Sequence, residues 1–224
     1  MSFPEPPARQ EVLHSAGADD APIDLYKMSD SDSLVGQNIL YVGAGLDITP
    51  IVLFPKNNHY LMDSQPMSEF GNDIAPGYER PNFLARLDQV MSQIGLKKIG
   101  METLETPLAT ASRKAPLKIT YAGDHQRVTY FANAAFPDAL SLIPVPCSVL
   151  VVCGFSLTGR APDFLAKWRH IICSSKTGYD GMSDEWGDTP ISTIVWDDEV
   201  ENEFLIENRT PEFIKRHTTI EHCW

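Results

Sequence analysis

Residues 38–63, NILYVGAGLDITPIVLFPKNNHYLMD, decide the predicted fold of this chain. The apolar run from Ile39 to Val42 is typical of a strand that is buried on both faces. It is followed by Gly43-Ala44-Gly45, and a backbone with two glycines can turn sharply and approach a ligand closely. Residues 51–54 predict a short helix after Pro50. A second apolar strand, from His59 to Met62, then ends at Asp63.

The spacing within this stretch favours a β-α-β unit. The 16 residues from Gly43 to Asn58 exceed the ~10–12 residues that a crossover between parallel strands needs. Asp63 follows Gly43 by 20 positions, which matches the ~20-residue spacing between a glycine-rich loop and a ribose-binding acid. Because parallel strands end at the same edge of a sheet, we expect Asp63 to lie beside the glycine turn.

The segments VGAGLD and YLMD resemble the first two motifs of the class I S-adenosylmethionine-dependent methyltransferases. This resemblance implies an α/β, three-layer Rossmann-like methyltransferase fold with a mostly parallel sheet and antiparallel edge strands. It also implies S-adenosylmethionine as cofactor, with Gly43, Ala44 and Gly45 against its methionine part and Asp63 on its ribose. Asp47 stands where the family has a third loop glycine, and we expect it near the methionine amino group.

Two further observations bear on the cofactor. Many methyltransferases place an acid at the adenine amino group with a Gly-Asp pair after the third strand, and Asp124 is a candidate for that role. The β-rich runs around residues 123–126 favour a simple hairpin turn instead. A nicotinamide cofactor is disfavoured because Ile48 occupies the third glycine position of the G-x-G-x-x-G pattern.

The predicted function is methyl transfer from S-adenosylmethionine to a small molecule or protein, and two alternatives stay open. The first is a non-catalytic binding or structural module with an eroded cofactor site, because a fold does not imply activity. The second is a serine hydrolase that uses Ser156, since residues 154–159, GFSLTG, resemble a nucleophile elbow. Thr158 replaces the second glycine of that motif. No acceptor-binding signature assigns a catalytic residue.

Composition limits the partners. The net charge of −12, from 30 acidic and 18 basic residues, argues against a nucleic-acid partner. The four cysteines and six histidines have no metal-ligand spacing, so we expect no metal site. The sequence shows no secretory leader and no ~18-residue apolar run, so a cytoplasmic protein without a membrane span is expected. The oligomeric state and the methyl acceptor stay open.

Beyond this unit, the pattern predicts a loose arm over residues 1–36 and one methyltransferase-like domain over residues 37–224. Apolar periodicity predicts helices over residues 82–94, 161–173 and 210–217, with a frayed end after the last. Residues 136–144 predict a further short helix. Strands are expected over the following segments: residues 97–104, 117–122, 128–132, 148–155, 191–196 and 203–206.

Overall fold

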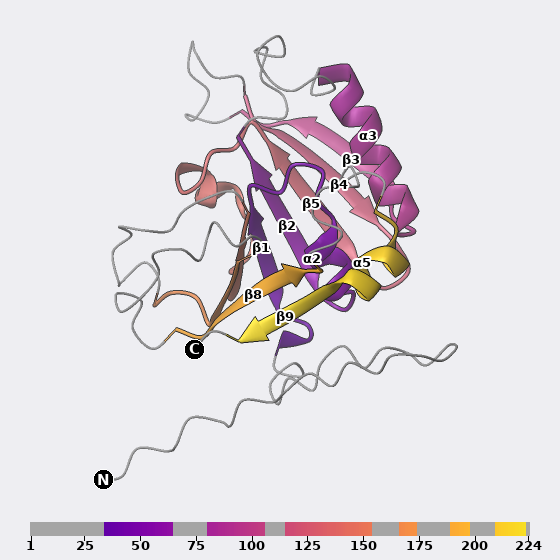
Figure 1. The fold of residues 1–224 in the computed structure, drawn as a ribbon. Coiled ribbons are helices and arrows are strands. Elements are labelled where there is room, and N and C mark those ends of the chain that lie inside the picture. The colour runs from indigo at the N-terminus through magenta and orange to yellow at the C-terminus, as the bar shows by residue number, and fades with distance from the viewer. Residues whose placement is uncertain are drawn as a thin grey trace, which may run out of the picture.

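The computed structural model describes residues 34–64, 80–105, 115–153, 166–173, 189–197 and 209–222. These ranges form an α/β fold around one mixed sheet of nine strands (Figure 1). The strands are β1 (Asn38–Val42), β2 (Asn58–Asp63), β3 (Lys97–Thr103), β4 (Leu117–Ala122), β5 (Arg127–Ala132), β6 (Val149–Val152), β7 (His170–Cys173), β8 (Ile191–Trp196) and β9 (Thr218–His222). The helices are α2 (Thr49–Leu53), α3 (Arg80–Gln93), the 3-10 helix η1 (Asp138–Leu142) and α5 (Pro211–His217).

The sheet is mostly parallel, in the order β3-β4-β5-β2-β1-β6-β7-β8-β9. The six strands from β5 to β8 in this order all run in parallel. The hairpin β3-β4 extends one side, and β9 pairs antiparallel with β8 on the other. The chain moves from β1 to β2 in one direction and later returns to the other side of β1 with β6. The order of strands therefore reverses between β1 and β6.

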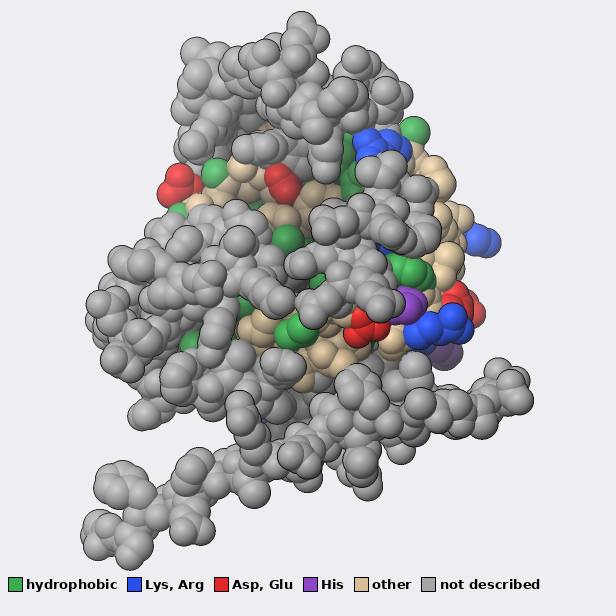
Figure 2. Space-filling view, in the orientation of Figure 1, with side chains coloured by type: hydrophobic (Ala, Val, Ile, Leu, Met, Phe, Trp, Pro, Cys, Tyr) green, Lys and Arg blue, Asp and Glu red, His purple; other side chains and the backbone are tan. Residues whose placement is uncertain are grey.

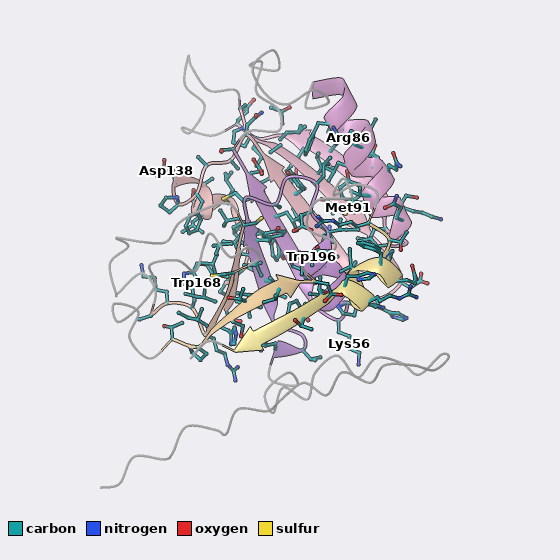
Figure 3. The ribbon with its side chains drawn as sticks, in the orientation of Figure 1. Lys56, Arg86, Met91, Asp138, Trp168 and Trp196 are labelled. Atoms are coloured by element: carbon teal, nitrogen blue, oxygen red, sulfur yellow. The ribbon has the colours of Figure 1, made fainter. Side chains whose placement is uncertain are left out.

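Each face of the sheet buries its own apolar cluster, because alternate strand residues point to opposite sides. The first cluster contains Ile39 and Tyr41 of β1 together with buried residues of α2, α3 and α5. Met91, for example, lies between α3 and the sheet (Figure 3). The second contains Leu40 and Val42, residues of η1, and Trp168. Within the described ranges, the three α-helices cover only the first face. The prediction of helices on both faces is therefore confirmed for the first face alone.

Most predicted elements are confirmed. The β-α-β unit is formed by β1, α2 and β2, and β4 and β5 form the expected hairpin. α3, α5, η1, β3, β6 and β8 also lie within a few residues of their predicted positions. Leu34, which falls within the predicted arm, is 3% exposed and belongs to the first cluster, so the folded domain begins no later than this residue.

The helix predicted over residues 161–173 is wrong at its end, because His170–Cys173 forms β7. All four of its residues are buried between β6 and β8. A short apolar run such as HIIC fits a buried strand and a helix face equally well by periodicity, and here pairing with two neighbouring strands decides.

The chain end after residue 217 is also different from the prediction. Thr218–His222 is not frayed but forms β9, which pairs antiparallel with β8 from Ser192 to Trp196. The predicted partner of β8, residues 203–206, lies outside the described ranges.

Candidate functional site

The glycine turn and Asp63 meet at the carboxyl edge of the sheet. Val42 is in register with Met62, and the Gly43 N–H donates to the Met62 carbonyl at 2.9 Å. One step further along, the Gly45 N–H donates to Oδ2 of Asp63 at 2.8 Å. The juxtaposition that the 20-residue spacing predicts is therefore present: the carboxylate of one strand end bonds to the loop that leaves its neighbour.

The backbone conformation and packing at residue 43 require a glycine. Its φ is +74°, in the left-handed region that glycine favours. A Cβ at this position would also lie 2.1 Å from the carbonyl oxygen of Cys153, just after β6. Cys153 in turn donates its N–H to the Val42 carbonyl at 3.0 Å. The close contact of two backbones at the β1/β6 junction therefore accounts for Gly43.

Gly45 is in a different situation. Its φ is +50°, but among the described residues a Cβ there would meet only Asp63 Oδ2, at 4.0 Å. The neighbouring Ala44 is 2% exposed and packs in the first apolar cluster. Among the residues that the structure describes, the Asp63 carboxylate is therefore the group that lies nearest to the side of Gly45 where a Cβ would stand.

Asp47 has its carboxylate bonded within the protein. One oxygen accepts from the Tyr41 hydroxyl at 2.7 Å. The other accepts from the N–H and the hydroxyl of Thr49, at 2.9 and 2.5 Å. With 8% exposure, Asp47 has little surface left for a ligand. It anchors the loop and the start of α2, and its expected role at a methionine amino group has no support in these contacts.

Asp124 lies far from the glycine turn. It sits in the β4-β5 hairpin turn, where the Gly123 N–H donates to the Gln126 carbonyl at 3.0 Å. This turn precedes β5, whereas Asp63 pairs with Ala132 at the other end of that strand. The hairpin interpretation is thus confirmed, and Asp124 is at the opposite edge of the sheet from Asp63.

The structure adds residues that the sequence reasoning did not include. Asn133 follows β5 at the same edge as Asp63, has a φ of +57°, and donates from Nδ2 to the Ala115 carbonyl at 3.4 Å. Tyr130 of β5 donates its hydroxyl to the Gly45 carbonyl at 2.9 Å. Recognising that β5, rather than β3, is the next parallel strand would have directed attention to both residues.

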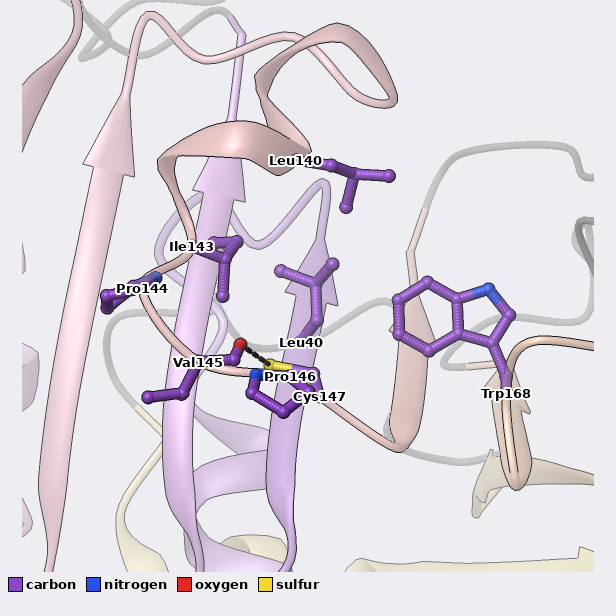
Figure 4. Close-up of a pocket in the computed structure, with 8 residues that line it drawn as sticks. All are labelled: Leu40, Leu140, Ile143, Pro144, Val145, Pro146, Cys147 and Trp168. Atoms are coloured by element: carbon purple, nitrogen blue, oxygen red, sulfur yellow. Dashed lines mark hydrogen bonds between the residues drawn. The ribbon is translucent and has the colours of Figure 1, made fainter.

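A cavity of about 400 Å³ lies elsewhere, on the second face of the sheet (Figure 4). It is lined by Leu40, Leu140, Ile143, Pro144, Val145, Pro146, Cys147 and Trp168. Burial raises the pKa of the Cys147 thiol to about 12, so this thiol is neutral at ordinary pH. The cavity is apolar and does not include the Gly45–Asp63 site.

A buried histidine supports the β-α-β unit beneath the site. His59 is 1% exposed, and its Nε2–H donates to the Phe54 carbonyl, which follows α2, at 2.9 Å. Its Nδ1 has no hydrogen-bond partner among the described residues. Burial, the dominant effect, lowers the pKa of His59 to about 4, while the bond to Phe54 opposes the shift. This imidazole is therefore neutral near pH 7.

The described ranges contain no group of three or more potential metal-binding side chains. None of the helices described is long and apolar enough to cross a membrane. Acidic, basic and histidine side chains lie together on the surface over α5 (Figure 2). Glu212 lies in the first turn of this helix, and the basic and histidine residues 215–217 lie in its last turn. Ser156, the alternative nucleophile, lies outside the described residues.

Searches against family models, curated proteins and solved structures gave no significant match to the chain.

Proposed function

We propose that this chain binds S-adenosylmethionine at the carboxyl edge of β1 and β2 and transfers its methyl group to a small molecule or protein. The observation that carries the proposal is the 2.8 Å hydrogen bond from the Gly45 N–H to the Asp63 carboxylate. This bond joins Gly45 of the VGAGLD segment to Asp63 of the YLMD segment. A glycine loop that no described side chain crowds and a carboxylate at the next strand end suit a ribose and its substituents.

The strand order supports a nucleoside-binding role for this edge. Counted along the chain, the six parallel strands lie in the order third, second, first, fourth, fifth and sixth. This is the classic order of doubly wound dinucleotide-binding sheets. In such sheets ligands bind beyond the carboxyl ends of the strands, where the order reverses. Here the reversal lies between β1 and β6, directly beside Gly43. The antiparallel edge pair β8-β9 agrees with the methyltransferase resemblance.

The residues present fit the cofactor chemically. A carboxylate offers about four lone-pair positions, so the Asp63 carboxylate, which accepts from Gly45 through Oδ2, is of the chemical type that also accepts from ribose hydroxyls. When bound, the cofactor supplies an electrophilic methyl: an acceptor lone pair forms the new bond to carbon, and the electrons of the carbon–sulfur bond remain on sulfur as S-adenosylhomocysteine. The protein's contribution is to align the acceptor with that methyl and exclude water, which requires positioning more than acid–base groups.

A second candidate, a non-catalytic module of the same fold, has its own supporting observation. The contact with the Cys153 carbonyl explains Gly43 without any ligand. The hydrogen bonds of Asp47 to Tyr41 and Thr49 explain that residue in the same way. Only Gly45 and Asp63 then distinguish an enzyme from a module that keeps the fold for another purpose.

Calorimetric titration with S-adenosylhomocysteine separates the candidates. We expect the wild-type chain to bind, and Asp63→Ala to weaken binding by about 1–3 kcal/mol, the range for losing a hydrogen-bonding charged group. The matched control is Asp88→Ala. Asp88 lies in α3, away from the loop that contains Gly45, and its carboxylate accepts from Tyr121 and Lys98. Asp88→Ala should leave the affinity within twofold of wild type.

The outcomes are distinct. A folded wild-type chain that does not bind S-adenosylhomocysteine would refute cofactor binding and favour the non-catalytic module. Binding that Asp63→Ala and Asp88→Ala weaken equally would place the ligand elsewhere. Covalent labelling of Ser156 by a fluorophosphonate would instead support the hydrolase alternative.

A further inference from the structure

The loop that contains Gly45 is held by side chains from three adjacent strands. Asp63 of β2 accepts from the Gly45 N–H at 2.8 Å. Tyr130 of β5 donates to the Gly45 carbonyl at 2.9 Å. Tyr41 of β1 reaches the same loop through Asp47, at 2.7 Å. All these strands lie side by side in the sheet, so the loop is fixed from below by the rigid part of the fold.

The bonds to Gly45 act on two different peptide groups. The N–H that Asp63 accepts belongs to the peptide between residues 44 and 45, and the carbonyl that Tyr130 holds belongs to the peptide between residues 45 and 46. Because peptides are planar, fixing both planes fixes φ and ψ of the residue between them. Glycine has the widest choice of these angles, so holding Gly45 in one orientation costs more conformational entropy than for any other residue. The two hydrogen bonds offset that cost.

Tyr130 reaches the Gly45 carbonyl from within the apolar core. Its side chain is fully buried in the first apolar cluster, and its ring lies 6.0 Å from that of Phe83 in α3. The ring can therefore keep its packing without the hydroxyl. In register, Tyr130 lies beside Leu61, two residues before Asp63. Its hydroxyl thus extends along the sheet toward the carboxyl edge, where the loop lies.

We propose that Tyr130 is a positioning residue for the cofactor site: by holding the Gly45 carbonyl, it keeps the Gly45 N–H on Asp63 and both groups in ligand-binding orientation. The part of this inference that concerns the ligand rests on the proposed function. The part that concerns the conformation of the loop does not. Tyr130 acts through Gly45 and does not itself contact the cofactor. The role is distinct from ordinary core packing because it depends on one oxygen atom.

The test compares Tyr130→Phe with Tyr121→Phe. Tyr121 is a matched control, since it is 1% exposed, lies on the same face, and donates its hydroxyl to Asp88 at 2.8 Å. It pairs with Val128 near the start of β5, at the end of the sheet opposite to Gly45. Both variants remove one hydroxyl and keep a ring, and because Tyr121 donates to a carboxylate, its loss should reduce global stability at least as much as the loss of the Tyr130 hydroxyl.

Two measurements are made on each full-length variant. Calorimetry with S-adenosylhomocysteine should show about five- to tenfold weaker binding for Tyr130→Phe, the effect of one net hydrogen bond, and less than a twofold change for Tyr121→Phe. Hydrogen exchange of the ligand-free proteins should show at least fivefold faster exchange of the Gly45 and Asp47 amides, which bond to Asp63 and to the Ala44 carbonyl, in Tyr130→Phe only.

The two measurements keep the proposals separable. If the wild-type chain binds no S-adenosylhomocysteine, the proposed function fails, and faster loop exchange in Tyr130→Phe alone would still support loop positioning by Tyr130. If the loop exchanges equally in both variants, or if both bind the ligand with equal affinity, the positioning role is refuted.

Discussion

Acidification should destabilise this protein through the buried imidazole of His59. Burial lowers its folded-state pKa from 6.5 to about 4. Between these values the unfolded chain binds a proton that the folded chain does not, so stability falls as the pH decreases from about 6.5 to about 4. Because a tenfold change in proton affinity corresponds to about 1.4 kcal/mol, the difference between a pKa of 6.5 and one of about 4 amounts to about 3 kcal/mol.

The assay is urea unfolding of wild type and His59→Gln at several pH values from 7.5 to 4. Other groups also titrate in this range, so the informative quantity is the difference in unfolding free energy between the two proteins. This difference should shift by about 3 kcal/mol in favour of the variant as the pH falls. His125→Gln, in the exposed β4-β5 turn, serves as the matched substitution that removes an imidazole outside the core. A wild-type-minus-variant difference that stays constant from pH 7.5 to 4 would refute the reasoning.

Two further predictions concern local backbone geometry. Gly43→Ala should destabilise the fold by about 2–5 kcal/mol, from a left-handed φ and the Cys153 carbonyl. Gly95→Ala, with a φ of +77° and open space, should cost only about 1–2 kcal/mol; equal losses of melting temperature would contradict the clash. Thr210→Ala should cost about 1 kcal/mol in urea unfolding, because its hydroxyl caps α5 by accepting from the Phe213 N–H at 3.2 Å. Thr210→Ser should retain the cap, and a loss as large as that of alanine would argue against it.

The central strands could be predicted from the sequence because they are apolar runs between turn-forming residues. Residues 39–42 and 149–152 are buried on both faces between parallel neighbours, which leaves little choice other than apolar side chains that favour strands. The β4-β5 hairpin was equally accessible, since Gly123 and its polar neighbours separate two β-rich runs. In these segments local preference and tertiary environment agree.

β7 and β9 could not be predicted because their structure depends on partners distant in sequence. His170–Cys173 becomes a strand through its pairing with β6 and β8. Thr218–His222 continues directly from α5, and its strand conformation follows from pairing with β8. In both cases four or five residues are too few for periodicity to separate the alternatives.

The site was predictable to the level of strand ends and not to the level of side-chain contacts. Spacing alone was sufficient to bring Asp63 to the glycine turn, because parallel strands in register end together. The bond from Tyr130 to Gly45 depends on β5 lying beside β2, and the sequence places the β3-β4 hairpin between them. Nothing local to residue 130 indicates that its hydroxyl reaches a loop 85 positions away.

The two glycines of the turn have different physical causes, although they look alike in the sequence. Gly43 is required by the fold, because the backbone after β6 occupies the space that a Cβ would need. Gly45 has no such neighbour among the described residues, and its conformation is held by Asp63 and Tyr130. A chain that kept only the fold would need the first glycine and the buried bonds of Asp47, whereas we propose that the carboxylate and the phenol that hold the two peptide groups of Gly45 serve a binding site. The Gly45 peptide, rather than the glycine pair as a whole, is therefore where cofactor binding should be tested.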